Sequence, residues 1–199
     1  MSVDFTQSKT RENLMRAFAG ESQARNRYTF AASFAKKNQL HVIESVFLFT
    51  AEQERSHAKV FYDQLKPFSG SEIQVDGSYP VSLFETVSDY LRDAEKNEAH
   101  EFQDAYPGFG RIAREEGFES IARIFEQIAD VENTHSIRFR QLAELVEQNK
   151  LFVADAQVQW MCLNCGHIEN AVAAPETCPV CQHPKGYFVR LELAPWTQE

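Results

Sequence analysis

The stretches Glu54-Arg55-Ser56-His57 and Glu132-Asn133-Thr134-His135 decide the fold of this chain. Each has the pattern Glu-x-x-His, and residues three apart lie on one face of a helix, where both side chains can bind one ion. Their neighbours three and four residues away are small or apolar, Ala51 and Ala58 among them. Carboxylates buried among such residues without compensation cost on the order of tens of kcal/mol. One such pattern alone usually faces solvent, whereas two of them favour metal binding.

The two patterns occupy matching positions of an internal repeat. Leu14-x-x-Ala17-x-x-x-Glu21 matches Leu91-x-x-Ala94-x-x-x-Glu98, and Glu21 lies 33 residues before Glu54 while Glu98 lies 34 before Glu132. Two similar helical hairpins predict a four-helix bundle. One glutamate from each of two helices and a Glu-x-x-His from each of the others are the ligands of di-iron carboxylate bundles. Such ligands suit iron or manganese.

The third helix offers three glutamates on one stripe, which are Glu95, Glu98 and Glu101. The repeat favours Glu98, while Glu101 lies one turn further and can reach the same site as an extra ligand. Glu95 is expected near the site or in solvent. Two tyrosines, Tyr28 and Tyr106, follow the ligands of the first and third helices, and each is either a core residue or a hydrogen-bond partner of the site.

Apolar periodicity and breakers predict the helix boundaries. Ser82 with Glu85 has the spacing of a capping box and predicts the start of the third helix. Pro107-Gly108 is expected to interrupt that helix, and Val131 is expected on the inner stripe of the fourth. A loop is expected at 67–80, and the helices at about 4–37, 40–66, 82–105 and 119–149.

All four cysteines lie near the carboxyl end, as Cys162-x-x-Cys165 and Cys178-x-x-Cys181. Two close pairs of this spacing predict one tetrahedral thiolate metal site rather than a disulfide framework. Four thiolates suit zinc or iron equally. The Cys-Pro-x-Cys sequence and the nearby aromatic residues resemble rubredoxin and favour iron; these residues are Trp160, Tyr187, Phe188 and Trp196.

The composition excludes other classes of protein. The chain has 199 residues, 43% of them hydrophobic, and a net charge of -9. An acidic surface repels nucleic acid and anionic lipid, so we expect neither as a partner. The first residues, MSVDFTQSKTREN, contain no apolar segment typical of a signal peptide, so we expect a cytoplasmic protein. The chain is thus expected to be mainly α, with a helical bundle over 1–150 and a small strand-and-loop metal domain over 157–199.

Longer motifs extend this pattern over almost the whole chain. They are Ala19-Gly20-Glu21-Ser22, Glu54-x-x-His57, Glu98-x-His100-Glu101 with Tyr106-Pro107, Arg111-Ile112-Ala113-Arg114-Glu115-Glu116-Gly117, Glu132-x-x-His135, and the four cysteines followed by His183-Pro184-Lys185. This set resembles the rubrerythrin family, a ferritin-like di-iron bundle with a rubredoxin-like domain. His167 departs from the resemblance, because an aromatic residue usually follows Cys-Gly in rubredoxin.

The resemblance implies seven bundle ligands, with Glu54 and Glu132 bridging two irons and the first iron moving between Glu101 and His57. It selects Glu98 and Glu101 over Glu95. The implied ligands are Glu21, Glu54, His57, Glu98, Glu101, Glu132 and His135 for two irons in the bundle, and Cys162, Cys165, Cys178 and Cys181 for a third iron.

The resemblance also implies the activity, which is reduction of hydrogen peroxide to water in protection against oxidative stress. Electrons are expected from NAD(P)H through separate redox proteins of the rubredoxin and reductase type, and then through the four-cysteine iron. A homodimer is expected to place one chain's four-cysteine site beside the other's di-iron site. The competing hypotheses are a ferritin-like ferroxidase and a non-catalytic zinc-ribbon protein with a plain helical bundle.

Overall fold

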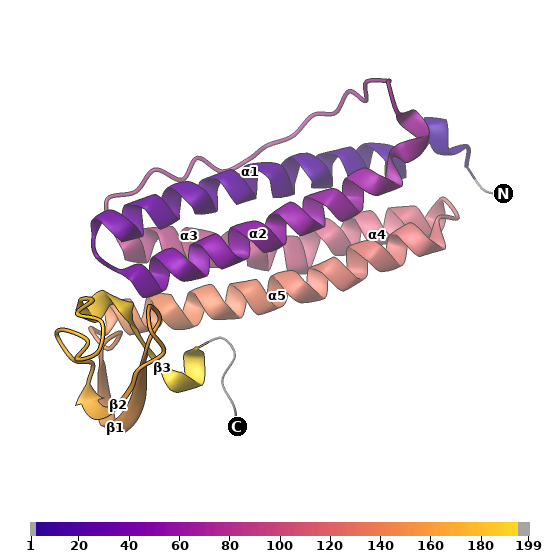
Figure 1. Cartoon of the computed structure of the whole chain (residues 1–199). Coiled ribbons are helices and arrows are strands. Elements are labelled where there is room, and N and C mark those ends of the chain that lie inside the picture. Colours follow the sequence, from indigo (N-terminus) through magenta and orange to yellow (C-terminus); the bar gives the residue numbers. More distant parts are fainter. Residues whose placement is uncertain (1–2, 195–199) are drawn as a thin grey trace.

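Two helical hairpins form a four-helix bundle in the computed structural model, which describes residues 3–194. In the first hairpin α1 packs along α2, and in the second α3 and α4 pack along α5 (Figure 1). The helices are α1 (Lys9–Lys37), α2 (His41–Gln64), α3 (Val87–His100), α4 (Tyr106–Glu115) and α5 (Glu119–Glu147). Within the described residues, no helix combines the length and the apolar character needed to cross a membrane.

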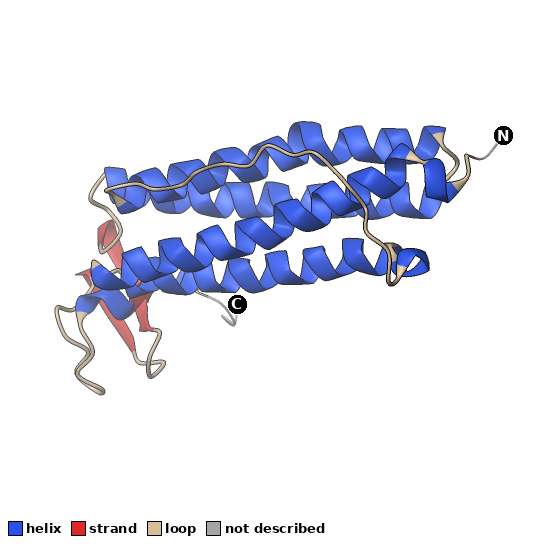
Figure 2. Cartoon of the chain, turned by 90° about the horizontal axis from the view of Figure 1, so that it is seen from above, coloured by secondary structure: helices blue, strands red, loops and turns tan. Residues whose placement is uncertain are grey.

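One long crossover joins the two hairpins. Residues 69–86 run along the outside of the bundle from the end of α2 to the start of α3 (Figure 2). The side chain of Arg16 on α1 holds this segment through an ion pair of 2.8 Å to Asp76. A four-helix bundle with one long crossover has the ferritin-like topology, which confirms the expected fold class.

The expected start of the third helix at Ser82 is wrong. α3 begins at Val87, and the Thr86 hydroxyl accepts a hydrogen bond of 3.1 Å from the backbone N–H of Asp89. The Ser82 hydroxyl instead donates to a carboxylate oxygen of Asp93 at 2.5 Å. Ser82 therefore pins the crossover to the side of α3 rather than capping its first turn.

The expected interruption at Pro107-Gly108 is also wrong, because α4 runs through both residues. The departure from α geometry comes earlier, in a π-helical turn over Glu101–Ala105. Such a turn accommodates an extra residue within a helix and is frequent at functional sites. Pro107 follows in the first turn of α4, where a missing N–H is tolerated.

The apolar core of the bundle is divided into two layers along its length. One layer lies toward the α1–α2 turn and includes Tyr28, Phe47, Leu91 and Phe139. The other lies toward the α4–α5 turn and includes Leu14, Phe61, Tyr106 and Phe125. Val131, expected inside, is 36% exposed. The buried glutamates described below lie between these two layers.

The four-cysteine part contains a small antiparallel sheet of order β2-β1-β3. Its strands are β1 (Val153–Cys162), β2 (Ile168–Ala173) and β3 (Phe188–Arg190). Trp160 is fully buried on β1, and its indole N–H donates to the Ala171 carbonyl at 3.0 Å. Trp196, which we expected in the aromatic setting of the cysteines, lies outside the described residues.

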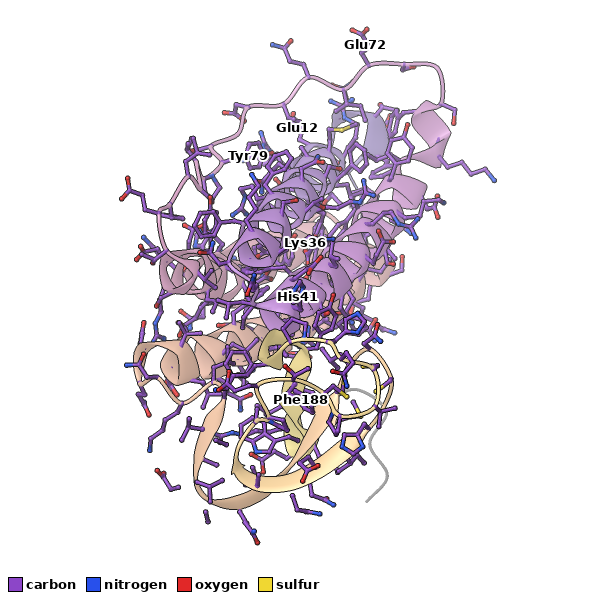
Figure 3. The ribbon with its side chains drawn as sticks, turned by 60° about the vertical axis from the view of Figure 1, so that its left-hand side comes forward. Glu12, Lys36, His41, Glu72, Tyr79 and Phe188 are labelled. Atoms are coloured by element: carbon purple, nitrogen blue, oxygen red, sulfur yellow. The ribbon has the colours of Figure 1, made fainter. Side chains whose placement is uncertain are left out.

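A close junction attaches this sheet to the end of the bundle beside the α1–α2 turn (Figure 3). The His41 ring, at the start of α2, stacks on the Tyr187 ring with 4.1 Å between centroids. Val42 packs with Val189. Gly186 lies against the backbone of Gln39 in the α1–α2 turn. A Cβ added at Gly186 would lie 1.8 Å from the Gln39 carbonyl oxygen.

We predict that Gly186→Ala destabilises this junction. The added methyl group overlaps backbone rather than a flexible side chain, and overpacking of this kind costs about 1–3 kcal/mol. Denaturant unfolding should show the loss. The matched change Gly108→Ala, where nothing lies within 4 Å of the new Cβ, should not lower the stability. Equal stability of the two variants would mean that the close approach at Gly186 is absent in solution.

Candidate metal centres

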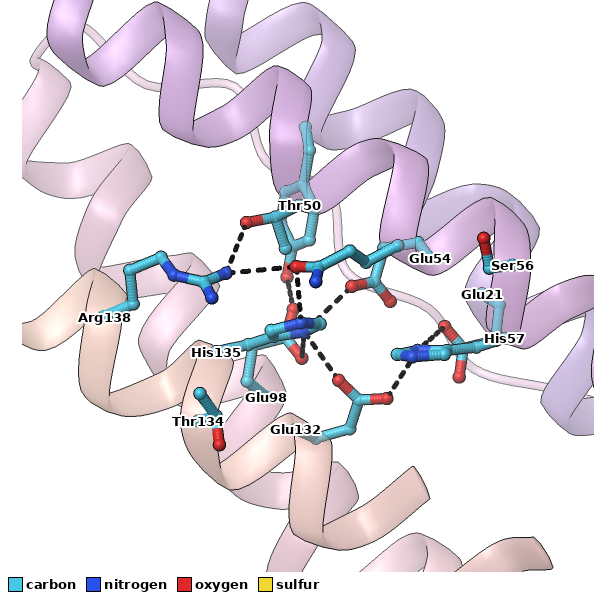
Figure 4. A network of polar contacts seen from close by, with 12 residues as sticks. Glu21, Thr50, Glu54, Ser56, His57, Glu98, Glu132, Thr134, His135 and Arg138 are labelled. Atoms are coloured by element: carbon cyan, nitrogen blue, oxygen red, sulfur yellow. Dashed lines mark hydrogen bonds and ion pairs between the residues drawn. The ribbon is translucent and has the colours of Figure 1, made fainter. Parts of the chain in front are cut away.

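Six of the expected bundle ligands converge from four helices into the space between the two apolar layers (Figure 4). The glutamates and His135 are buried, and only the His57 side chain keeps some exposure, at 12%. Each helix contributes a side chain to the cluster because its inward-facing stripe of residues includes a glutamate or histidine at the same level of the bundle. The six are Glu21 on α1, Glu54 and His57 on α2, Glu98 on α3, and Glu132 and His135 on α5.

These side chains form two overlapping groups of four. One group is Glu21, Glu54, His57 and Glu132, and the other is Glu54, Glu98, Glu132 and His135. In each group the ligand atoms lie within 4.8 Å of one another. Glu54 and Glu132 belong to both groups, which is the position required of carboxylates that bridge two ions.

The two histidines face the carboxylates with the same ring nitrogen. Nδ1 of His135 lies 2.7 Å from Glu132 and 3.0 Å from Glu54. Nδ1 of His57 lies 2.9 Å from the other carboxylate oxygen of Glu132. The two rings are nearly parallel, with 20° between their planes and 5.7 Å between centroids. Glu132 therefore lies between the two histidines, one on each oxygen.

The donor set fits two divalent cations. Among the described residues, eight buried side-chain atoms of this cluster have no hydrogen bond of acceptable geometry. Buried polar groups are otherwise almost always satisfied. They are Oε2 of Glu21 and Glu98, both carboxylate oxygens of Glu54 and Glu132, and Nδ1 of His57 and His135. Buried oxygen and imidazole atoms that converge without hydrogen-bond partners are what iron or manganese requires.

Without metal the cluster holds like charges together, and the carboxyl pKa values respond. Burial and the charges of Glu98, Glu21 and Glu132 raise the pKa of Glu54 well above its usual range. Burial also raises the pKa of Glu98 to about 7, although His135 opposes this shift. Both groups would therefore favour protonation in the absence of a cation.

The pKa values of the two histidines also rise, whereas the pKa of Glu132 falls. Burial lowers the pKa of both histidines, but the carboxylates close to Nδ1 outweigh it, so that the values rise to about 10 for His57 and about 9 for His135. Burial raises the pKa of Glu132, but His135 and His57 outweigh it and lower the value to about 2. These shifts mean that the carboxylates favour the positive charge of both imidazoles, while the imidazoles favour the negative charge of Glu132.

The seventh expected ligand, Glu101, lies on the π-helical turn directly after α3. Its carboxylate belongs to neither group of four, whereas His57 belongs to one. Burial and the charges of Glu21, Glu98 and Glu132 raise the pKa of Glu101 well above the usual range. Glu101 is therefore close enough to these carboxylates to be repelled by their charges. The arrangement of this structure therefore has His57 in the cluster and Glu101 beside it.

Both tyrosines hydrogen-bond to the cluster. The Tyr28 hydroxyl donates to Oε1 of Glu98, and the Tyr106 hydroxyl donates to Oε1 of Glu21. Burial and neighbouring carboxylates raise the pKa of both phenols well above the usual range, so they keep their protons. Each tyrosine also belongs to one apolar layer, so each is both a core residue and a hydrogen-bond partner of the cluster.

The four cysteine sulfurs form the second centre. Sγ of Cys162 lies 3.7 Å from Sγ of Cys181, and Sγ of Cys165 lies 3.6 Å from Sγ of Cys178. Four sulfurs bound about 2.3 Å from one metal ion are about 3.8 Å apart. The distances therefore fit tetrahedral metal binding, and they are far too long for disulfides.

Two similar turns carry the cysteine pairs. The residue after each pair, Gly166 or Gln182, has a positive φ of 76° or 60°. This conformation aims backbone N–H groups at sulfur, and the N–H of His183 contributes most to lowering the pKa of Cys181 to about 6. The imidazoles of His167 and His183 contact Glu169 and the Cys181 carbonyl instead of joining the sulfurs.

Two polar residues near the bundle cluster escaped the sequence analysis. Gln53 lies beside the outer nitrogen of His135, and Arg138 contacts Gln53. The available signal was an arginine three residues after a ligand on a helix face that is otherwise apolar. Glu95, by contrast, pairs with Arg92 at 2.7 Å, outside the cluster as expected.

Loading the bundle with ferrous iron should release protons. Around pH 7 both histidines hold a proton in the metal-free chain, and a metal ion needs the lone pair that this proton occupies. The affinity of the bundle site for ferrous iron should therefore rise between about pH 6 and about pH 9. Titration calorimetry in buffers of different ionisation enthalpy measures the released protons, with the four-cysteine site filled beforehand. A heat of binding independent of the buffer would contradict this ligand set.

Two family matches cover most of the chain. Residues 12–143 match the family Rubrerythrin, and residues 160–189 match the rubredoxin-like domain of rubrerythrin. The first match contains all the glutamates and histidines of the bundle cluster, and the second contains the four cysteines. Both centres therefore lie inside the matched segments.

Relatives match over nearly their full length. Rubrerythrin of Porphyromonas gingivalis is 43% identical over 94% of this chain and 92% of its own. Rubrerythrin-1 of Clostridium acetobutylicum is 45% identical over 91% and 93%. A solved structure of nigerythrin in a fully reduced, all-ferrous state is 27% identical, with a TM-score of 0.62 over 92% of this chain and 90% of that one.

The donor atoms and the family agree on the metals, which are two iron ions in the bundle and one iron ion among the four thiolates. Oxygen and imidazole ligands in the first centre and sulfur ligands in the second leave the two kinds of site chemically distinct. With a ferritin-like bundle, a four-cysteine sheet and full-length relatives above 40% identity, this chain belongs to the rubrerythrin family.

Proposed function

We propose that this protein is a peroxidase that reduces hydrogen peroxide to two molecules of water, taking up two electrons and two protons. The observation that carries the proposal is the double group of ligands that shares Glu54 and Glu132. When bound there, two ferrous ions supply one electron each and a place for both peroxide oxygens. Reduction of peroxide to water without release of a hydroxyl radical needs both electrons together, which two adjacent metal sites would allow.

The ligand set that we propose for the bundle is Glu21, Glu54, His57, Glu98, Glu132 and His135, with Glu101 as an alternative to His57. The proposed ligands of the third iron are Cys162, Cys165, Cys178 and Cys181. Glu54 and Glu132, which belong to both groups of four, would serve both bundle ions, and each remaining residue would serve one. The position of Glu101 beside the cluster supports an exchange with His57 when the charge of the site changes.

The surrounding side chains supply proton control and exclude bulk water. The phenols of Tyr28 and Tyr106 keep protons on their hydroxyl oxygens and donate them to carboxylates that are proposed ligands. Among the six proposed ligands only the His57 side chain is partly exposed, at 12%, so we propose that peroxide enters from its side.

The electron supply belongs to the same proposal. Electrons pass through the four-cysteine iron, and they originate from NAD(P)H through partner redox proteins of the rubredoxin and reductase type. Tyr187 stacks on His41, whereas Glu54 lies thirteen residues further along α2, about 20 Å away at 1.5 Å per residue. This separation within one chain supports a homodimer, in which the four-cysteine site of one chain serves the bundle of the other.

The four free cysteines favour a reducing compartment, and we propose the cytoplasm. There the protein would remove peroxide as part of protection against oxidative stress. Neither nucleic acid nor a membrane is part of the proposed function.

Steady-state kinetics should distinguish the proposed activity from iron storage. Peroxide consumption driven by a reduced donor should exceed oxygen-driven oxidation and uptake of ferrous iron by at least about tenfold, because the site is built to be re-reduced through the third iron. Metal analysis of the same sample should find iron in both centres. Faster iron oxidation than peroxide turnover would identify a ferroxidase, and zinc as the only metal would identify a non-catalytic ribbon protein.

Glu98→Ala should lower peroxide turnover by more than about 100-fold, because loss of an outer partner of a metal ligand alone costs about 10–100-fold. The visible spectrum of the ferric four-thiolate centre should be unchanged. Glu95→Ala is the matched control, since Glu95 lies on the same helix and pairs with Arg92. Equal activity of the two variants would remove Glu98 from the ligand set.

The converse change, Cys162→Ser, should abolish the thiolate spectrum while the bundle still binds two irons. Turnover supported by the reductase should fall, and a single turnover of chemically reduced protein should remain. Loss of both centres from either change would show that they are not independent.

A further inference from the structure

The outer nitrogen of His135 has a partner of its own. While Nδ1 faces the carboxylates, Nε2 points to the opposite side and lies 3.1 Å from Oε1 of Gln53 on α2 (Figure 4). The two residues are 82 positions apart in the chain, so this contact crosses from one hairpin to the other. His57 makes no such contact through its outer nitrogen in the part of the chain that the structure describes.

Arg138 determines which way the Gln53 amide points. Its guanidinium donates to Oε1 of Gln53 at 3.2 Å and to the Thr50 hydroxyl at 3.2 Å. A guanidinium has donors and no acceptor, so the amide atom that it faces must be the carbonyl oxygen and not the NH2 group. The orientation of this amide is therefore fixed by chemistry.

The orientation of Gln53 in turn determines the proton on His135. An amide oxygen only accepts, so Nε2 of His135 must donate and carry the proton. In a neutral imidazole the other nitrogen then has a free lone pair. That nitrogen is Nδ1, which faces Glu54, Glu98 and Glu132.

We propose that Gln53 and Arg138 are positioning residues, which hold His135 as the Nε2–H tautomer with the Nδ1 lone pair directed into the metal cluster. The inference rests on the proposed function, because it deepens the role of one proposed ligand. Metal-bound histidines generally donate their other N–H to an acceptor, which fixes the ring and strengthens the ligand. Here the acceptor is a neutral amide, and a cation holds that amide.

Arg138 is itself held on several sides. Its guanidinium lies 5.4 Å from the centre of the Phe49 ring, in addition to the bond to Thr50. The Phe49 ring lies near the surface. Arg138 on α5 thus reaches across to Thr50 and Gln53 on α2 beside His135. A cation with five fixed donors suits this place better than a lysine, whose single ammonium cannot bind both partners in fixed directions.

The test uses the full-length protein with iron in the four-cysteine site and zinc as a diamagnetic probe in the bundle. Long-range ¹H–¹⁵N spectra of the His135 ring should show a proton on Nε2 and metal on Nδ1. Gln53→Leu removes the acceptor and should weaken zinc binding in the bundle by about 10–100-fold and mix the tautomers. Arg138→Met should act in the same direction.

Two further variants separate positioning from general structure. Gln53→Glu keeps an oxygen acceptor that pairs with Arg138, so it should restore the Nε2–H signal and most of the zinc affinity. Gln141→Leu makes the same change as Gln53→Leu at an exposed position of α5 and should have no effect. The spectrum of the four-cysteine iron should be the same in all variants.

The outcomes distinguish this inference from the proposed function. If wild-type His135 binds no metal, the proposed ligand set is wrong and the positioning role is wrong with it. If wild-type His135 binds zinc through Nδ1 but Gln53→Leu keeps the same tautomer and affinity, the ligand set stands and the positioning role is overturned.

Discussion

Like-charged carboxylates at the centre of a helical bundle are the constraint on which the rest of this structure depends. Glu21, Glu54, Glu98 and Glu132 are essentially inaccessible to water, and an apolar layer lies on either side of them. Two divalent metal ions among these carboxylates remove the repulsion between them. The tyrosine at each layer boundary gives one carboxylate a hydrogen bond while its ring completes the apolar packing.

The two kinds of metal centre have opposite surroundings, in keeping with different tasks. The bundle centre is enclosed by helices, and among its six clustered side chains only His57 keeps some exposure. The four-cysteine centre is borne on turns, with Cys165 exposed, which suits exchange of electrons with another protein. The junction at Gly186 and His41 holds the two parts of one chain in a fixed relation, since backbone meets backbone there.

The helices and the residues that cluster in the two candidate metal centres could be predicted from sequence, because their signals are local. Glu-x-x-His spacing and apolar periodicity depend on neighbours within one helix. The start of α3 was mispredicted because the Ser82 hydroxyl finds a distant partner in Asp93. The π-helical turn and the contacts of Gln53 with His135 and Arg138 join different helices or alter backbone geometry, and no local spacing encodes them. No local spacing singles out His41 either, because its partner, Tyr187, lies in the other part of the chain.

Anomalous diffraction at the iron absorption edge tests the central claim most directly, using crystals of protein purified and loaded with iron under anaerobic conditions. The account requires two iron peaks inside the bundle, each in contact with both Glu54 and Glu132, and a third peak among the four sulfurs. A bundle with no iron peak, in which the glutamates pair only with His57 and His135, would contradict it.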